Sequence, residues 1–113
     1  MTATSKLWWP MTEALIAVTM ALVRTGDWQR YTGKLIQMRS SDHICTLLRW
    51  MPWLVRINDY IKGHFVDSER GGEWWGYLNR DGSRASDAKG GNYKGCFHVP
   101  RALLMCTQMV EEW

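Results

Sequence analysis

The sequence predicts a mainly helical fold, and three stretches carry this prediction. Residues 14–23 form an almost wholly apolar run, which is typical of a helix buried on most of its surface. Along residues 53–65, apolar side chains recur at helical spacing with charged residues between them, and residues 100–112 carry overlapping apolar faces. A chain of 113 residues that is 46% hydrophobic fits one small domain, or a piece of a larger one.

The first predicted helix is introduced by Pro10 and extends to Arg24, with Gly26 at a plausible C-terminal cap. Glu13 lies in its first turn, where the helix dipole favours a carboxylate. Glu13 also stands beside two tryptophans and before a buried run. From these residues alone, Glu13 is equally well read as a cap or as a ligand contact.

The segment from residue 34 to residue 52 has no clean period. Asp42 could cap a short helix over residues 44–50, which Pro52 would end. The next helix is then expected over residues 53–65. His43 carries no partner signal and is interpreted as a surface or capping residue, whereas His64 lies near the end of the helix over residues 53–65, where a cation suits the helix dipole.

An aromatic segment at residues 73–79 is strand-like, and the Asp81-Gly82 pair that follows supplies the positive φ of a tight turn. We therefore predict a short β-hairpin near residues 73–84. A glycine-rich loop then leads to His98, and Pro100 opens the last helix, so we expect His98 just before that helix.

Composition excludes several classes of function. The net charge is +3, and the basic residues are scattered along the chain without a run, a pattern that does not predict nucleic-acid binding. The three cysteines form no CxxC pair and favour reduced thiols in the cytosol. The N-terminus lacks the apolar core of a signal peptide, and the longest apolar run is too short to cross a bilayer. No spacing typical of metal ligands or of a phosphate loop is present.

Eight tryptophans are the unusual feature of the composition. Each is more simply explained by core packing, but together they suit aromatic walls around a sugar. An isolated histidine such as His98 also more often packs or caps than does chemistry. A loop histidine, the carboxylate of Glu13 and several tryptophans nevertheless form a set that suits proton transfer on a carbohydrate.

Three motifs in order resemble the N-acylglucosamine 2-epimerase family, also called renin-binding protein. They are Leu-Trp-Trp-Pro-x-x-Glu-Ala at 7–14, Gly-Glu-Trp-x-Gly-Tyr-Leu-x-Arg-Asp-Gly at 72–82, and Lys-Gly-Cys-Phe-His-Val-Pro-Arg-Ala-Leu at 94–103. The resemblance covers residues 6–33 and 53–113. It implies the C-terminal part of an (α/α)₆ toroid, in which helices form two concentric rings.

The resemblance also implies a reaction and a site. The family interconverts N-acetylglucosamine and N-acetylmannosamine through proton transfer at C2 between two histidines. By motif, His98 corresponds to one of these histidines, Glu13 to an active-site carboxylate, and Trp9 to a wall of the sugar pocket. Arg101 would orient the loop. The resemblance further implies an amino-sugar substrate, no cofactor or metal, nucleotide as an activator, a homodimer, renin binding and a cytoplasmic location.

Two departures from the family pattern matter. The other catalytic histidine is absent, and neither His43 nor His64 stands in a motif that could replace it. Residues 34–52 look inserted. We therefore expect residues 1–113 to form a partial toroid domain that does not epimerise sugars alone.

Three alternatives remain. The chain could belong to another aldose isomerase or epimerase of the same toroid. It could be a non-catalytic piece that binds protein or sugar. A tryptophan-rich carbohydrate-binding module is disfavoured, because such modules are usually β-sandwiches and residues 14–23 predict a buried helix.

Overall fold

The computed structural model describes residues 5–25 and 41–112 of the chain. Within these ranges it is mainly helical, as predicted. The long helices are α1 (Trp8–Thr25), α3 (Ser41–Tyr60) and α4 (His98–Glu111), and a π-helical turn (Ile61–Phe65) continues α3. The strands β1 (Lys6–Leu7) and β2 (Tyr77–Leu78) pair antiparallel.

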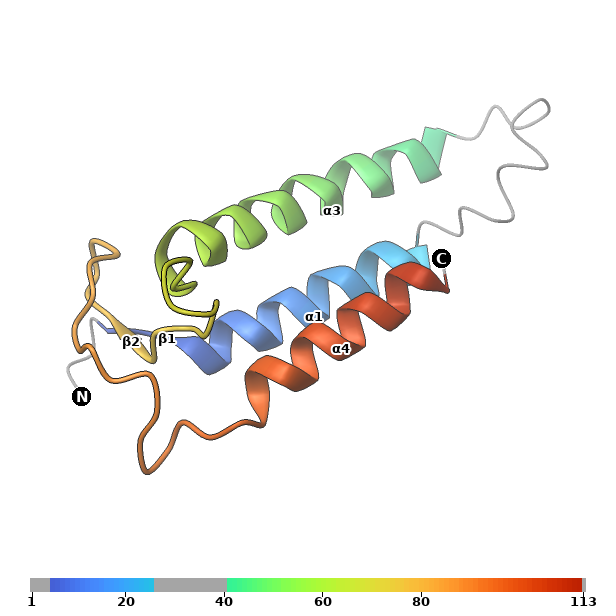
Figure 1. Cartoon of the computed structure of the whole chain (residues 1–113). Coiled ribbons are helices and arrows are strands. Elements are labelled where there is room, and N and C mark those ends of the chain that lie inside the picture. The colour runs from blue at the N-terminus through green and yellow to red at the C-terminus, as the bar shows by residue number, and fades with distance from the viewer. Residues whose placement is uncertain (1–4, 26–40, 113) are drawn as a thin grey trace.

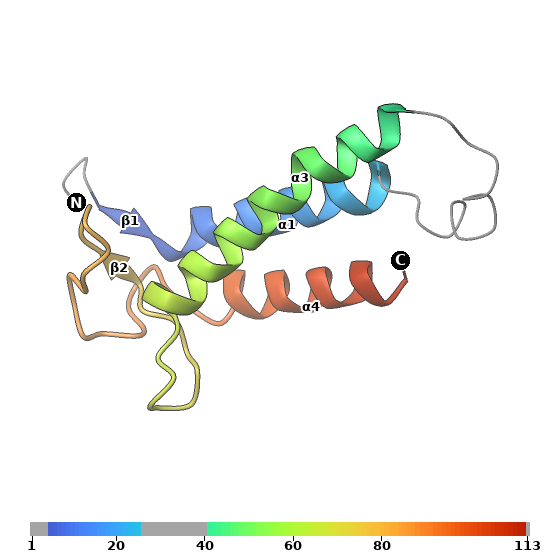
Figure 2. The ribbon, with the colours of Figure 1, turned by 90° about the horizontal axis from the view of Figure 1, so that it is seen from above.

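Helix α1 packs against both α3 and α4 (Figures 1 and 2). The helix α3 runs antiparallel to α1, whereas α4 runs parallel to it (Figure 1). The first turns of α1 and α4 therefore lie at the same end of the helical layer. The two-stranded ladder and the loops of residues 66–97 lie there too, and we call this the loop end.

The buried face of α1 is narrower than the sequence predicted. Its fully buried side chains recur at helical spacing, and they include Thr12 and Thr19. These two hydroxyls tolerate burial because each donates to a carbonyl of its own helix, Thr12 to Trp9 at 2.7 Å and Thr19 to Leu15 at 2.8 Å. Ala17 is exposed, because α3 and α4 cover α1 from only part of its circumference.

The prediction that Pro52 ends a short helix was wrong. Residues 41–60 form one continuous helix, α3, with Pro52 inside it. Pro52 is exposed, so water can hydrate the carbonyl that its missing N–H leaves unbonded. The predicted insertion, residues 34–52, is described only from residue 41, where it forms the first part of α3. The predicted stop at Gly26 lies outside the described residues, and so do the side chains of Asp42 and His43.

The turn at Asp81-Gly82 is confirmed, but the predicted hairpin is only part of the pairing. Gly82 has a φ of +93°, and Leu78 and Arg84 form an isolated antiparallel bridge around the turn. The longer pairing of β2 is with β1, where Leu78 lies opposite Lys6 and Tyr77 opposite Leu7. The N-terminal residues were not predicted to pair, since a strand of two residues leaves no periodic signal.

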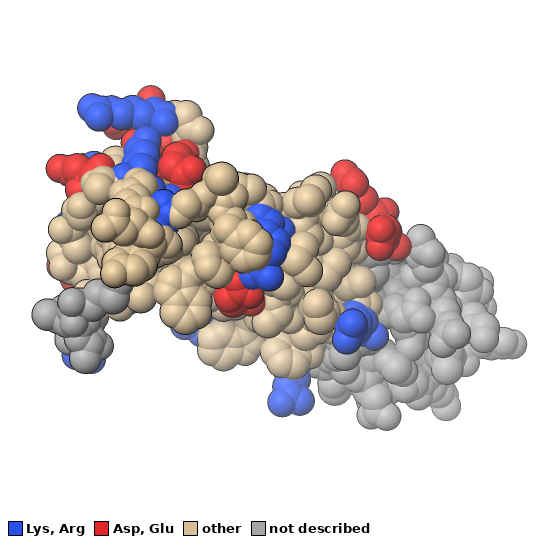
Figure 3. All heavy atoms as spheres, turned by 90° about the horizontal axis from the view of Figure 1, so that it is seen from below, with Lys and Arg blue, Asp and Glu red and all other residues tan. Residues whose placement is uncertain are grey.

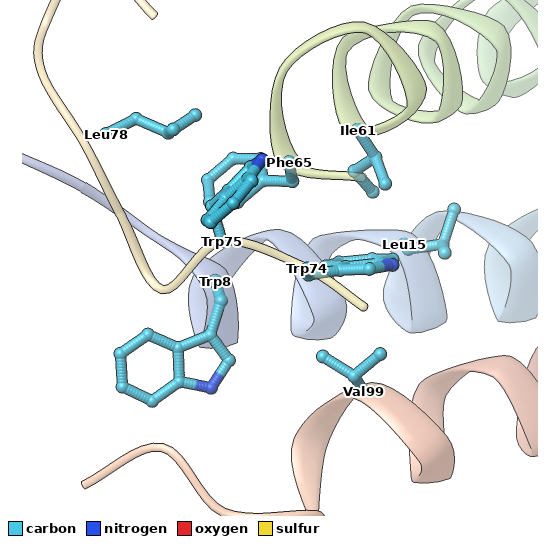
Figure 4. Close-up of a cluster of buried hydrophobic side chains, with 8 residues drawn as sticks. All are labelled: Trp8, Leu15, Ile61, Phe65, Trp74, Trp75, Leu78 and Val99. Carbon is cyan, nitrogen blue, oxygen red and sulfur yellow. The ribbon is translucent and has the colours of Figure 1, made fainter. Parts of the chain in front are cut away.

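The hydrophobic core lies at the loop end and joins α1, the π-helical turn, residues 74–78 and α4 (Figure 4). Figure 4 shows the ring of Trp74 next to Leu15 of α1 and above Val99 of α4. Phe65 is fully buried, and its carbonyl accepts a hydrogen bond from the Trp75 N–H at 2.7 Å. The buried members of the hydrophobic core are Trp8, Leu15, Ile61, Phe65, Trp74, Trp75, Leu78 and Val99.

Next to this core, an apolar groove of about 350 Å³ lies among α1, α3 and α4. Leu15, Leu54 and Cys106 contribute to its lining. The outer face of α4 is also apolar, with Leu103 48% and Leu104 59% exposed. Uncovered apolar area of this kind is typical of a surface that packs against further structure.

None of the described helices is long and apolar enough to cross a membrane. On the face shown in Figure 3, acidic and basic side chains lie next to one another, most of them at the loop end.

Candidate active site

The parallel packing of α1 and α4 brings three predicted residues together. Glu13 lies in the second turn of α1 and not in the first as predicted, because the helix begins at Trp8. His98 is the first residue of α4, and Arg101 lies one turn further along α4. Glu13 Oε1 lies 3.1 Å from His98 Nδ1. The same oxygen accepts a hydrogen bond from Arg101 Nη2. The structure thus joins residues from the first and the third motif of the sequence.

Each of the two helices begins two residues before a proline. Helix α1 starts at Trp8 and contains Pro10, and α4 starts at His98 and contains Pro100. Proline fits the first turn of a helix because its nitrogen needs no hydrogen there. His98 therefore lies within the first turn and not before it, a small correction to its predicted position. This placement fixes the backbone of His98 within the helix.

Arg101 and His98 keep Glu13 ionised. The hydrogen bond from Arg101 is the largest effect and that from His98 the next, and together they lower the pKa of the Glu13 carboxyl below its ordinary value. The three side chains are between 32% and 40% exposed. The cluster is therefore a partly hydrated site at the surface of the described chain, open to a ligand.

The ionised carboxylate selects one form of the His98 ring. A carboxylate can only accept, so the 3.1 Å contact requires a proton on His98 Nδ1. In the neutral ring, Nε2 then carries the lone pair and can take a proton from another molecule. The pair Glu13–His98 thus has the arrangement of an oriented general base.

Two exposed aromatic rings stand beside His98. The ring of Trp9 lies 6.3 Å from the His98 ring, centroid to centroid, and Trp9 is 44% exposed. The ring of Phe97 lies 5.1 Å away in an edge-to-face arrangement, and the Arg101 guanidinium carbon lies 5.0 Å from its centroid. Trp9 was singled out by its motif. Phe97 was missed, although its place directly before His98 was a signal.

The other described histidine has a structural setting. His64 lies in the π-helical turn, stacks on Tyr60 with ring centroids 4.3 Å apart, and places Nδ1 3.3 Å from the Gly82 carbonyl oxygen. It packs against Tyr60 and the turn at Gly82, contacts that the predicted role at the helix end did not include. Among the described residues, no group of three or more His, Cys, Asp and Glu side chains is arranged to hold a metal ion.

Two ion pairs of the loop end were missed by sequence reasoning. Lys94 Nζ lies 2.7 Å from Glu73 Oε1, and the Lys94 side chain is only 4% exposed. Lys89 Nζ lies 2.6 Å from Asp67 Oδ2 beside a polar cavity of about 300 Å³. Lysines in a glycine-rich loop predict exposure, so the sequence carried no signal for either pair.

Comparison with known proteins supplies the class. No family model matches the sequence. The sequence is 43% identical over 109 residues to N-acylglucosamine 2-epimerase of Bos taurus and 41% identical over 105 residues to that of Homo sapiens. Each match covers 93% of this chain and 20% of the relative. The chain therefore spans about a fifth of the length of these relatives.

A solved structure agrees. The fold is similar to cellobiose 2-epimerase from Spirochaeta thermophila, with a TM-score of 0.61 and 25% sequence identity over 96% of this chain and 22% of that one. The fold and the sequence together define this chain as part of an α/α toroid, the fold of that epimerase. Its sequence is similar to N-acylglucosamine 2-epimerases over a fifth of their length, as expected for a C-terminal part of such a protein.

Proposed function

We propose that this chain supplies one of two proton-transferring histidines to an N-acyl-D-glucosamine 2-epimerase. The observation that carries the proposal is the hydrogen bond between His98 Nδ1 and the ionised Glu13 carboxylate, because it leaves His98 Nε2 free to act on a substrate. The similarity to N-acylglucosamine 2-epimerases supports an amino sugar as that substrate.

The proposed step inverts C2 of the open-chain sugar. His98 Nε2 takes the proton from C2, the C–H electron pair forms the C1=C2 double bond, and the carbonyl oxygen gains the negative charge. A second group on the opposite face then returns a proton to C2, so the substituents at C2 exchange sides. The reaction runs in either direction with His98 as base or as acid, as microscopic reversibility requires.

The aromatic rings beside His98 have a matching role. Trp9 offers an exposed apolar face on which a sugar can stack, and Phe97 offers a second one. Arg101 donates to the same Glu13 oxygen that contacts His98, and thereby helps to orient His98 through Glu13.

The second base lies elsewhere. His64 is packed against Tyr60 and the Gly82 carbonyl, so it does not face His98 across a substrate. The chain matches only 20% of each relative, and the remainder of a whole epimerase would supply the opposing histidine. We therefore propose that the 113-residue chain alone does not epimerise N-acetylmannosamine.

Further properties of a whole protein rest on the family resemblance alone. We propose a cytoplasmic homodimer that needs no cofactor, responds to nucleotide as an activator and binds renin.

A related activity is the second candidate. The similarity of the fold to a cellobiose 2-epimerase favours the same proton transfer on another aldose. A third possibility is a non-catalytic piece that binds sugar or protein, which the fivefold greater length of the relatives favours. An epimerase of either substrate exchanges the C2 proton of its sugar, whereas a non-catalytic piece does not.

Exchange of the C2 proton with solvent is the direct test. N-acetylmannosamine, N-acetylglucosamine and cellobiose are incubated in D₂O with the bovine relative, with its variant carrying Asn at the position that matches His98, and with this chain. We expect deuterium at C2 of both amino sugars with the relative. With the Asn variant we expect no epimerisation, and exchange of at most one amino sugar, the one whose C2 proton faces the second base; with this chain we expect no epimer. Exchange of both amino sugars by the Asn variant would refute the role of His98, and turnover by this chain would refute its dependence on a second base.

A further inference from the structure

Lys94 is a buried lysine in a polar loop. Its side chain is 4% exposed, although lysine is among the residues that are rarely buried. Nζ donates to Glu73 Oε1 at 2.7 Å. Removing an ammonium group from water is costly unless a partner compensates it. Glu73 supplies that partner, so the position of Lys94 is tied to the position of Glu73.

Glu73 is itself held by the core. Its Oε1 also accepts the backbone N–H of Trp74 at 2.8 Å, and Trp74 is 3% exposed within the hydrophobic cluster. The next residue, Trp75, donates its N–H to Phe65 at 2.7 Å. The Glu73 side chain is itself 50% exposed, but the hydrogen bond to the Trp74 N–H ties its carboxylate to the backbone of two core residues.

The backbone and the stem of Lys94 are fixed as well. Gly91 and Lys94 exchange two backbone hydrogen bonds, at 3.3 Å and 3.2 Å, which close a tight turn. The lysine stem passes over Gly76, where an added Cβ would lie 3.0 Å from Lys94 Cδ. Lys94 is therefore held by a charge, by a turn and by close packing.

This anchored residue lies four positions before His98. Gly95, Cys96 and Phe97 between them are exposed, and Val99 directly after His98 is buried at 6% exposure. The exposed link thus runs between two fixed points, Lys94 and the first turn of α4. We propose that Lys94 is a positioning residue whose ion pair with Glu73 holds the loop so that His98 faces Glu13. Its importance for catalysis rests on the proposed function.

The test compares two lysines of the same loop. Lys94→Met removes the ammonium and keeps most of the apolar stem. Lys89→Met is the matched control, since Lys89 also pairs with an acid of the loop end, Asp67, at 2.6 Å. Two readouts are made on the 113-residue chain without sugar. They are the ¹⁵N spectrum of the His98 ring, which reports its tautomer, and hydrogen exchange of the amides of residues 95–98.

In Lys94→Met we expect His98 to lose its single Nδ1-protonated form and to populate both tautomers. Amide exchange at residues 95–98 should rise about tenfold, which corresponds to ~1.4 kcal/mol of lost local protection. Lys89→Met should leave both readouts as in the parent. Unchanged readouts in Lys94→Met, or equal changes in both variants, would overturn the proposal.

Lys94→Met could alter His98 merely by destabilising the whole chain, so Glu73→Gln breaks the same ion pair from its other side. The amide oxygen can still accept from Trp74 while the counter-charge of Lys94 is gone. Glu73→Gln must reproduce the change at His98, and an unaltered His98 spectrum in this variant contradicts the proposal. Because no sugar is present, failure of this test leaves the proposed function standing. The reverse outcome is also distinct. If the variants change His98 as expected but the bovine relative does not exchange the C2 proton, the proposed function is contradicted and the role of Lys94 in positioning His98 stands.

Discussion

The imidazole Nδ1 of His98 lies 3.1 Å from the Glu13 carboxylate across a sequence separation of 85 residues. Parallel packing of α1 and α4 creates this contact, because it sets the second turn of α1 beside the first turn of α4. The contact gives His98 an orientation and a tautomer that a lone loop histidine would lack. It is therefore the structural basis for treating His98 as a base.

Replacing Glu13 by Gln tests the contact. The amide keeps the size of the side chain but can turn either its NH₂ or its oxygen toward His98, so the tautomer is no longer selected. In a whole epimerase that carries this substitution at the matching position, we expect kcat for C2 exchange to fall by a factor on the order of 10², as for loss of an oriented general base.

The control for Glu13→Gln is Glu111→Gln, which changes an exposed carboxylate in the last turn of α4. It should leave exchange and the His98 ring spectrum unchanged. If Glu13→Gln retained full exchange, the carboxylate would have no part in orienting His98.

Sequence reasoning could reach the Glu13–His98 site because both residues stand near proline-marked helix starts within recognisable motifs. It could not reach Pro52, because the local rule predicts a helix end whereas exposure of Pro52 lets α3 continue. It could not reach the Lys94–Glu73 pair either. Burial of a lysine depends on where Trp74 and Gly76 come to lie, and that is a property of the packed core.

Acid should weaken the fold. The pKa of Glu13 is lowered from its ordinary value of 4.5, chiefly by Arg101 and then by His98. Asp81 shows the same direction, because Ser83 donates to its carboxylate. A carboxyl with a lowered folded pKa contributes stability that is complete above its unfolded pKa and is lost as pH falls through the folded value.

The prediction is thus a urea midpoint that stays level from pH 7 to about pH 5.5 and drops below about pH 4.5, where unfolded carboxyls bind protons first. Circular dichroism at each pH measures it. Glu13→Gln should flatten part of the acid limb, and an acid limb identical to that of the parent would show that the Glu13 interactions do not stabilise the fold.

The turn at Gly82 should reject a side chain. Its φ is +93°, and an added Cβ would lie 2.8 Å from His64 Nδ1. Gly82→Ala therefore combines backbone strain with a steric clash, and we expect a loss of about 1–3 kcal/mol in the free energy of unfolding.

Gly63→Ala is the matched control for Gly82→Ala. Gly63 lies in the neighbouring π-helical turn, and an added Cβ there meets nothing within 4 Å. This substitution should be neutral or slightly stabilising, by up to about 1 kcal/mol. Equal effects of the two substitutions would contradict the geometry of the turn.

Substitutions of Phe65 and Phe97 should have different effects, the first on the stability of the fold and the second on contact with the sugar. Phe65 is 0% exposed at the centre of the core, whereas Phe97 is 62% exposed beside His98. Phe65→Ala should cost about 3–5 kcal/mol, because it opens a cavity among packed rings. Phe97→Ala should change stability by less than about 0.5 kcal/mol, as surface substitutions usually do.

In a whole epimerase, however, the change matching Phe97→Ala removes a stacking surface and should raise KM for the amino sugar more than it lowers kcat. Denaturant unfolding of the chain and steady-state kinetics of the whole enzyme measure the two effects. If Phe97→Ala destabilised the chain as strongly as Phe65→Ala, the ring of Phe97 would be a core residue and not part of the sugar-facing surface.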